Sequence, residues 1–149
     1  NSEINVNLGH QVDTQWGDTL NLNIKIKKIT DGRFTYNGGI WDNTIGEMGP
    51  SALVSYKSID IIISTYGTYE WNCEQFLSFD LNLEKYKFIV VKNPMNYKNS
   101  FSHIENIFVL DTLGPTPPTC KKLKFKKIKK YYPKDENLKF EDVLIKLHN

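Results

Sequence analysis

The sequence predicts a mixed α/β fold: a βαβαβ core over residues 60–110, further antiparallel hairpin strands in the same mixed sheet, and a C-terminal helix. Residues 88–91 and 107–110 are short apolar runs, typical of strands covered on both faces, although a buried helical turn has the same pattern. Between these runs, large apolar side chains recur at helical spacing: Tyr97, Phe101 and Ile104. A helix between two buried strands predicts a βαβ unit with a right-handed crossover.

Alternating side chains predict antiparallel strands in the first half of the chain. Apolar residues alternate with Asn or Lys over residues 20–26, the two-residue period of a strand with one solvent face, and the period slips at Lys28-Ile29. The turn signal Thr30-Asp31-Gly32 precedes a second alternating run, which predicts a hairpin. A tight hairpin is also predicted for residues 52–56 and 59–65, with the second strand central in the sheet because it is apolar on both faces.

The remaining elements rest on sparser signals. A short helical stretch between residues 66 and 87 has the length of another crossover. Prolines after Asp111 predict an extended loop, and the alternation of Leu123 and Phe125 with lysines predicts an edge strand. Apolar spacing near the end of the chain predicts a helix over about 137–148.

Length and composition indicate an ordinary globular chain. Its 149 residues predict a single domain, residues 1–149, with a core over 18–130. The net charge of +2 does not indicate nucleic acid, and no apolar stretch is long enough to cross a membrane. Cys73 and Cys120 are far apart in sequence, which favours free thiols in a reducing compartment and predicts a cytoplasmic location. Because the chain begins at Asn1 rather than at methionine, we expect it to be part of a longer protein.

Polar residues at the ends of the predicted strands are the leading site candidates, because ligands of open α/β sheets collect beyond the carboxyl ends of strands. These residues are Lys92, Asn93, Asn96, Asp111 and Thr112. A lysine beside a helix start suits a carboxylate or a phosphate. The alternative is that the lysine is solvated and that one of the asparagines caps the helix.

Three other groups of residues have both a functional and a structural interpretation. Asp31 and Arg33 could present charge to a ligand, but hairpin turn chemistry is favoured. The basic run 121–130 could follow a phosphate backbone, but a solvated strand face is favoured. The histidines, His10, His103 and His148, form no metal-binding motif, and Cys73 lies in an apolar stretch typical of a buried thiol. The sequence therefore predicts neither a metal site nor a catalytic residue in this chain.

Several motifs in one order resemble a known family. They are Gly9–Gly17 (GHQVDTQWG), Thr30–Phe34 (TDGRF), Met48-Gly49, Lys92–Phe101 (KNPMNYKNSF) and Asp111–Pro118 (DTLGPTPP). Over roughly Gly9 to Glu136 the chain resembles the C-terminal domain of the MlrC family, which is named for microcystin degradation.

The resemblance implies a function in a larger enzyme. It implies an N-terminal catalytic domain of the same protein that holds zinc through Asp and His side chains, where metal-bound water attacks the carbonyl of a peptide-like substrate. The present chain would then be the domain without metal that packs on the catalytic one and shapes the substrate cleft. Such a chain is expected to be inert by itself.

Departures from the family pattern leave the activity open. Asn96 stands where the family has histidine, Tyr66-Gly67 where it has an Arg-Arg pair, and Leu77 where it has arginine. These changes remove a titratable group and three cations. The alternative interpretation is a diverged, non-catalytic binding or accessory module; a nucleic-acid-binding domain built on residues 121–130 ranks third.

Overall fold

The computed structural model describes residues 2–93, 96–116, 118–120, 123–128, 130–132 and 134–139. The chain forms two compact units, residues 1–107 and 108–149. A single domain over residues 1–149 therefore stays a prediction. In the described part of the chain, no helix has the length and apolar character needed to cross a bilayer.

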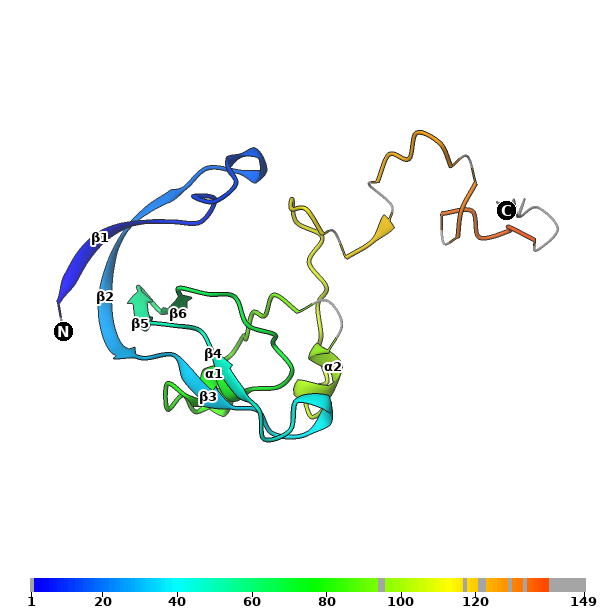
Figure 1. Ribbon diagram of the computed structural model, residues 1–149. Coiled ribbons are helices and arrows are strands. Elements are labelled where there is room, and N and C mark those ends of the chain that lie inside the picture. Colours follow the sequence, from blue (N-terminus) through cyan, green and yellow to red (C-terminus); the bar gives the residue numbers. More distant parts are fainter. Residues whose placement is uncertain are drawn as a thin grey trace, which may run out of the picture. The chain divides into compact units, whose positions relative to one another are not determined.

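The first unit is built on a four-stranded antiparallel sheet with the order β1-β2-β5-β6 (Figure 1). Its strands are β1 (Glu3–Leu8), β2 (Leu20–Thr30), β5 (Ser51–Tyr56) and β6 (Ile59–Ser64). The long strand β2 pairs with β1 along its first half and with β5 along its second half. The register shifts between Ile26 and Lys28, next to the slip that the alternation predicts at Lys28-Ile29. The predicted β5–β6 hairpin is confirmed.

A two-stranded ribbon and several short helices complete the first unit. The ribbon consists of β3 (Arg33–Thr35) and β4 (Ile45–Glu47), so the predicted pairing of the run after Thr30-Asp31-Gly32 with β2 is wrong. The helices have three or four residues each: η1 (Thr14–Trp16), η2 (Gly39–Trp41), α1 (Glu74–Leu77), η3 (Leu83–Lys85) and α2 (Tyr97–Ser100).

The core of the first unit lies between the ribbon and the sheet. Its buried residues are Phe34, Tyr36, Met48, Leu53 and Phe79, with Ile62, Trp71 and Leu81 packed against them. Phe34 is directly opposite Gly46 in the ribbon, and a Cβ atom added to Gly46 would lie 2.3 Å from the Phe34 ring. The missing side chain at Gly46 therefore lets the aromatic ring cross the neighbouring strand. Phe34 and Tyr36 meet edge to face with ring centroids 4.9 Å apart.

The predicted βαβαβ core is not confirmed. Residues 88–91 and 107–110 are described but belong to no strand, and β6 has β5 as its one neighbour among the described strands instead of lying centrally. Phe88 and Val90 are largely exposed, whereas Ile89 and Val91 are half-buried, so the segment has strand-like alternation without a ladder partner. An apolar run specifies a covered strand only when a neighbouring chain segment completes its hydrogen bonds.

The predictions for the second unit have a mixed outcome. Residues 123–125 form no strand, and Phe125 instead packs edge to face on Tyr131 with ring centroids 4.6 Å apart. The predicted C-terminal helix over 137–148 lies mostly outside the described residues, and residues 137–139 are not helical. That helix is therefore not confirmed.

Asp60 fixes the segment before residues 88–91 onto β6. Its carboxylate accepts hydrogen bonds from Lys27 Nζ at 2.7 Å and from the Tyr86 hydroxyl at 2.5 Å. Burial opposes the charge on Asp60, but these two hydrogen bonds hold the pKa of Asp60 below its ordinary value of 3.8. The same contact, together with burial, raises the pKa of Tyr86 to about 12.

We expect Asp60→Asn to lower the pKa of Tyr86 toward its ordinary value of 10, because the hydrogen bond to the carboxylate is the main cause of the shift. NMR titration of ring-labelled tyrosine measures this change. In the wild type the stability that comes from the raised pKa is present below pH 10 and is lost as the pH rises toward 12, so the variant should lose less stability over that range. Asp80→Asn, which removes an exposed partner of Lys28, is the control and should leave Tyr86 unchanged. An unaltered Tyr86 titration in Asp60→Asn would contradict the assignment.

Candidate functional site

Two of the predicted site residues, Asn93 and Asn96, join the segment before α2 to residues 69–71. The Asn93 amide donates to the carbonyl oxygen of Glu70, and its Oδ1 accepts from the backbone N–H of Asn96 at 2.8 Å. The Asn96 amide contacts the hydroxyl of Tyr69. This hydrogen bond of Asn93 matches the structural alternative, in which an asparagine side chain accepts a backbone hydrogen bond at the start of the helix. Asn96 precedes the helix without a side-chain capping bond and is turned toward Tyr69.

Ser100 fixes the other end of α2 to the same stretch. Its buried hydroxyl donates to the carbonyl oxygen of Trp71 at 2.7 Å. The Cys73 thiol donates to the carbonyl oxygen of Ser100 at 3.3 Å. Burial raises the pKa of Cys73, and the nearby charge of Glu74 adds to the effect. A thiol with a raised pKa is a poor nucleophile at neutral pH, which agrees with a structural role.

Lys92 acts on the carboxyl group of Glu70 through its positive charge. Lys92 is exposed and Glu70 is half-buried. Burial raises the pKa of Glu70, and the positive charge of Lys92 partly offsets this shift. The structure therefore groups Lys92, Asn93 and Asn96 with Glu70 and Tyr69, two residues that the strand-end argument did not select.

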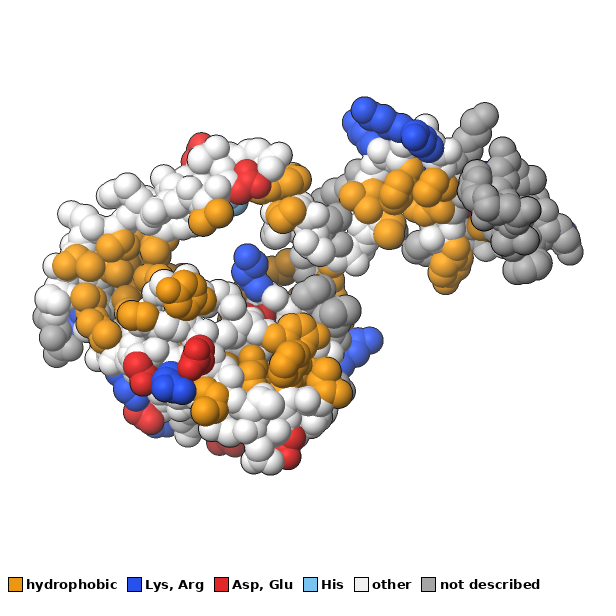
Figure 2. All heavy atoms as spheres, in the orientation of Figure 1, with side chains coloured by type: hydrophobic (Ala, Val, Ile, Leu, Met, Phe, Trp, Pro, Cys, Tyr) orange, Lys and Arg blue, Asp and Glu red, His pale blue; other side chains and the backbone are white. Residues whose placement is uncertain are grey.

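A row of aromatic rings runs from the core to the surface next to this group. The ring centroids of Tyr36 and Trp41 are 6.0 Å apart, those of Trp41 and Tyr69 6.2 Å, and those of Tyr69 and Trp71 6.2 Å. The Tyr36 hydroxyl donates to the carbonyl oxygen of Tyr69 at 2.6 Å. Gly39 makes the row possible, because a Cβ atom at this position would lie 2.1 Å from the Trp71 ring. Figure 2 shows hydrophobic side chains gathered beside η2 and α2.

Asp31 and Arg33 have local partners at the start of the ribbon. The carboxylate of Asp31 accepts from the backbone N–H of Arg33 at 3.0 Å, which is turn chemistry. The guanidinium of Arg33 pairs across the ribbon with Glu47 at 3.1 Å. Both charged side chains of this pair are exposed, so the pair contributes little to stability. These contacts support the turn interpretation that the sequence favours, and a role in ligand binding stays a prediction.

Asp111 and Thr112 belong to the second unit. Asp111 is half-buried and Thr112 is exposed. Their predicted grouping with Lys92 stays a prediction.

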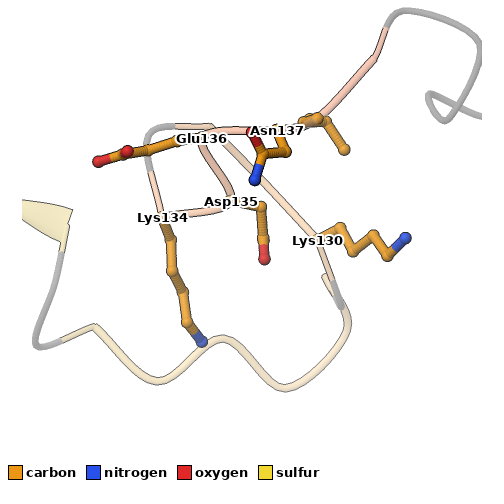
Figure 3. Close-up of a pocket in the computed structure, with 6 residues that line it drawn as sticks. Lys130, Lys134, Asp135, Glu136 and Asn137 are labelled. Atoms are coloured by element: carbon orange, nitrogen blue, oxygen red, sulfur yellow. The ribbon is translucent and has the colours of Figure 1, made fainter.

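The second unit carries an open hollow of about 410 Å³ (Figure 3). It is lined by Lys130, Lys134, Asp135, Glu136, Asn137 and Leu138. The Lys130 and Glu136 side chains extend in opposite directions. Asp135 accepts from the backbone N–H of Tyr131 at 2.9 Å, which closes a local turn. Side chains that diverge around a turn do not define a ligand site.

Zinc sites are built from His, Cys, Asp or Glu side chains grouped around one point. Among the described residues, no three or more His, Cys, Asp or Glu side chains are grouped so that they could hold a metal ion. His10 and His103 are exposed, and His148 lies outside the described residues. The described part of the chain therefore does not fit a zinc site.

Comparisons with known proteins identify the family. The family model for the MlrC C-terminus matches residues 1–127. The chain therefore belongs to the MlrC C-terminus family, as the motifs predict. No curated protein matches the chain.

A solved structure shows the same fold. A crystal structure from Mesorhizobium sp. BNC1, described as a "putative metallopeptidase", is similar with a TM-score of 0.72 and 21% sequence identity. The similarity covers 91% of this chain and 27% of that one. The chain thus spans about a quarter of the length of this structural relative.

Sequence reasoning missed Tyr69, Glu70, Trp71 and Ser100. The sequence predicts a crossover connection over the stretch 66–87, and connections are expected to be polar and exposed. One signal was available: Tyr69 and Trp71 are two large aromatic residues within three positions, and aromatic side chains are enriched on surfaces that contact another protein or domain.

Proposed function

We propose that this chain is the C-terminal domain of a larger, zinc-dependent peptidase or amidohydrolase of the MlrC type. In this proposal it packs on a catalytic N-terminal domain and forms one wall of the cleft for a peptide-like substrate. The observation that carries the proposal is family membership over residues 1–127, since the family takes its name from the C-terminus of a longer protein. The structural relative described as a metallopeptidase, of which this chain covers 27%, supports it.

The contacts around α2 support a positioning role for this domain. Asn93 and Ser100 attach both ends of the helix segment to residues 69–71. Lys92 directly precedes Asn93 and is exposed. An exposed cation on a fixed backbone suits a carboxylate or a carbonyl oxygen of a peptide. Activation of water would be supplied by zinc in the N-terminal domain, and the residues of this chain would bind and orient the substrate.

We expect Lys92→Ala to raise KM about 10-fold in the longer protein, because a hydrogen bond to a charged group is lost. Steady-state hydrolysis of a peptide amide, with zinc content measured in parallel, tests this. Lys85→Ala, which removes an exposed lysine from η3, is the control and should leave KM unchanged. An equal KM in wild type and Lys92→Ala, at full zinc content, would remove Lys92 from the substrate site.

A diverged accessory module is the second candidate. Asn96 replaces the family histidine and contacts Tyr69. Tyr66 and Leu77, which stand where the family has arginine, are 63% and 54% exposed, so the missing cations would have faced solvent or a ligand. A longer protein that binds zinc but hydrolyses no amide would favour this candidate.

A further inference from the structure

Positive charge is concentrated in the second unit. Seven of the ten residues 121–130, the basic loop, are lysine. Residues 108–149 contain ten Lys and five Asp or Glu, a net charge of +5, whereas residues 1–107 contain nine Lys or Arg and twelve Asp or Glu, a net charge of −3. The predicted edge strand, which would account for the lysines as protection against strand pairing, does not form at residues 123–125. The lysines therefore need another explanation.

Tyr131 joins the two ends and the middle of the basic loop. Its hydroxyl donates to the carbonyl oxygen of Cys120, the residue directly before the loop, at 3.2 Å. Phe125, in the middle of the loop, packs edge to face on the Tyr131 ring with centroids 4.6 Å apart. The backbone N–H of Tyr131 donates to the Asp135 carboxylate at 2.9 Å. These contacts make a compact turn, so the lysines are gathered around one aromatic contact.

The described lysines of the basic loop are exposed and unneutralised. They are Lys124, Lys126, Lys127 and Lys130. Among the described residues, no ion pair includes any of these four side chains. Like charges held this close repel one another, and a negatively charged surface relieves the repulsion.

Apolar side chains alternate with these lysines and are also exposed. Leu123 is 39% exposed, Phe125 43%, Ile128 52% and Tyr132 75%. Figure 2 shows lysine side chains next to hydrophobic ones on the second unit. Lysines interleaved with exposed apolar side chains are typical of segments that lie in the interface of an anionic bilayer, where the charges meet the headgroups and the apolar groups reach the acyl chains.

The same features fit single-stranded nucleic acid less well. Proteins that bind single strands stack the bases on free aromatic faces. The Tyr131 ring is contacted by Phe125, and the Lys134 ammonium group lies over it at 5.7 Å from the centroid. Leu123 and Ile128 have no planar face for a base. The loop thus combines positive charge with aliphatic rather than stacking surface, which favours lipid.

We propose that the basic loop binds the surface of an anionic phospholipid bilayer. The lysines contact the negatively charged headgroups, and Leu123 and Ile128 lie at the edge of the acyl chains. The loop holds the protein on one side of the membrane and does not cross it. The inference goes beyond the proposed function, because it requires only the second unit and no hydrolysis.

Co-sedimentation of the 149-residue chain with vesicles tests the proposal. One set of vesicles is phosphatidylcholine alone, and the other is phosphatidylcholine mixed with phosphatidylserine. Each lysine near an anionic surface strengthens binding about 5-fold, so we expect at least about 100-fold tighter binding to the mixed vesicles at low salt. The difference should shrink as the salt concentration rises, because salt screens the attraction.

Lysine variants assign the binding to the basic loop. The test variant replaces three exposed lysines of the loop with glutamine: Lys124, Lys126 and Lys127. The matched control replaces three exposed lysines of the first unit: Lys25, Lys85 and Lys98. Both variants lower the net charge by the same amount. We expect binding to the mixed vesicles to weaken about 100-fold in the test variant and to stay unchanged in the control.

An apolar variant separates lipid from nucleic acid. Ile128→Ser should weaken binding to the mixed vesicles about 5-fold, because the side chain no longer enters the interface. Val12→Ser changes a fully exposed apolar residue of the first unit and should leave binding unchanged. All these positions are exposed, so the variants are expected to fold like the wild type.

Three results would overturn the inference. No binding to the mixed vesicles would show that the lysines are only solvated. Equal weakening in the two lysine variants would show an effect of net charge without a site. Vesicle binding that is unchanged by Ile128→Ser and is displaced by an oligothymidylate would assign the loop to nucleic acid. None of these results bears on the hydrolase proposal, because the assay measures no bond cleavage.

Discussion

Phe34→Ala is expected to lower the free energy of unfolding of the first unit by about 3–5 kcal/mol, the range for removal of a buried phenylalanine. Phe34 is 8% exposed and lies in the cluster with Tyr36, Met48 and Leu53. The glycine opposite it has no side chain that could fill the space. Urea unfolding followed by tryptophan fluorescence measures the change, since Trp16, Trp41 and Trp71 all lie in residues 1–107.

The matched control is Phe88→Ala. Phe88 is 74% exposed, so this change is expected to alter the free energy of unfolding by less than about 0.5 kcal/mol. An equal loss in free energy of unfolding for the two variants would mean that the packing of Phe34 does not stabilise the core.

Gly39→Ala is expected to destabilise the first unit and to displace the Trp71 ring. Gly39 has φ +66°, a conformation strained for alanine, and the added Cβ atom would lie 2.1 Å from the Trp71 ring. Gly38→Ala is the control, because Gly38 has φ +83° but open space around the added atom. We expect the loss in free energy of unfolding to be about 1–3 kcal/mol larger for Gly39→Ala than for Gly38→Ala, which is the cost of overpacking.

The Trp71 indole signal reports the change in structure. It should shift in Gly39→Ala and stay near its wild-type position in Gly38→Ala. If both variants lose the same stability with the same indole signal, the Gly39–Trp71 contact does not order the aromatic row.

The sequence predicted the parts of the fold whose pattern depends on neighbours close in the chain. The alternation over residues 20–26 and the Lys57-Ser58 turn predict β2 and the β5–β6 hairpin correctly. Long-range pairing was less predictable: the run after Thr30-Asp31-Gly32 pairs with residues 45–47 instead of β2. The apolar run 88–91 suggested a covered strand, but its alternating exposure shows one face without cover.

The sequence selected some of the residues that the structure brings together around α2, and their role in binding stays a prediction. Asn93 and Asn96 lie where a turn before a helix was expected, and Lys92 precedes them. Their partners Tyr69 and Glu70 could not be predicted, because the hydrogen bonds span more than 20 residues and leave no periodic signal.

The central claim is that this chain acts as a domain without metal beside a catalytic one. Zinc content and peptide-amide hydrolysis, measured in parallel for the 149-residue chain and for the longer protein that includes it, test this claim most directly. The account predicts no stoichiometric zinc and no hydrolysis for the chain by itself, and both for the longer protein. Stoichiometric zinc together with hydrolysis by the 149-residue chain would contradict it.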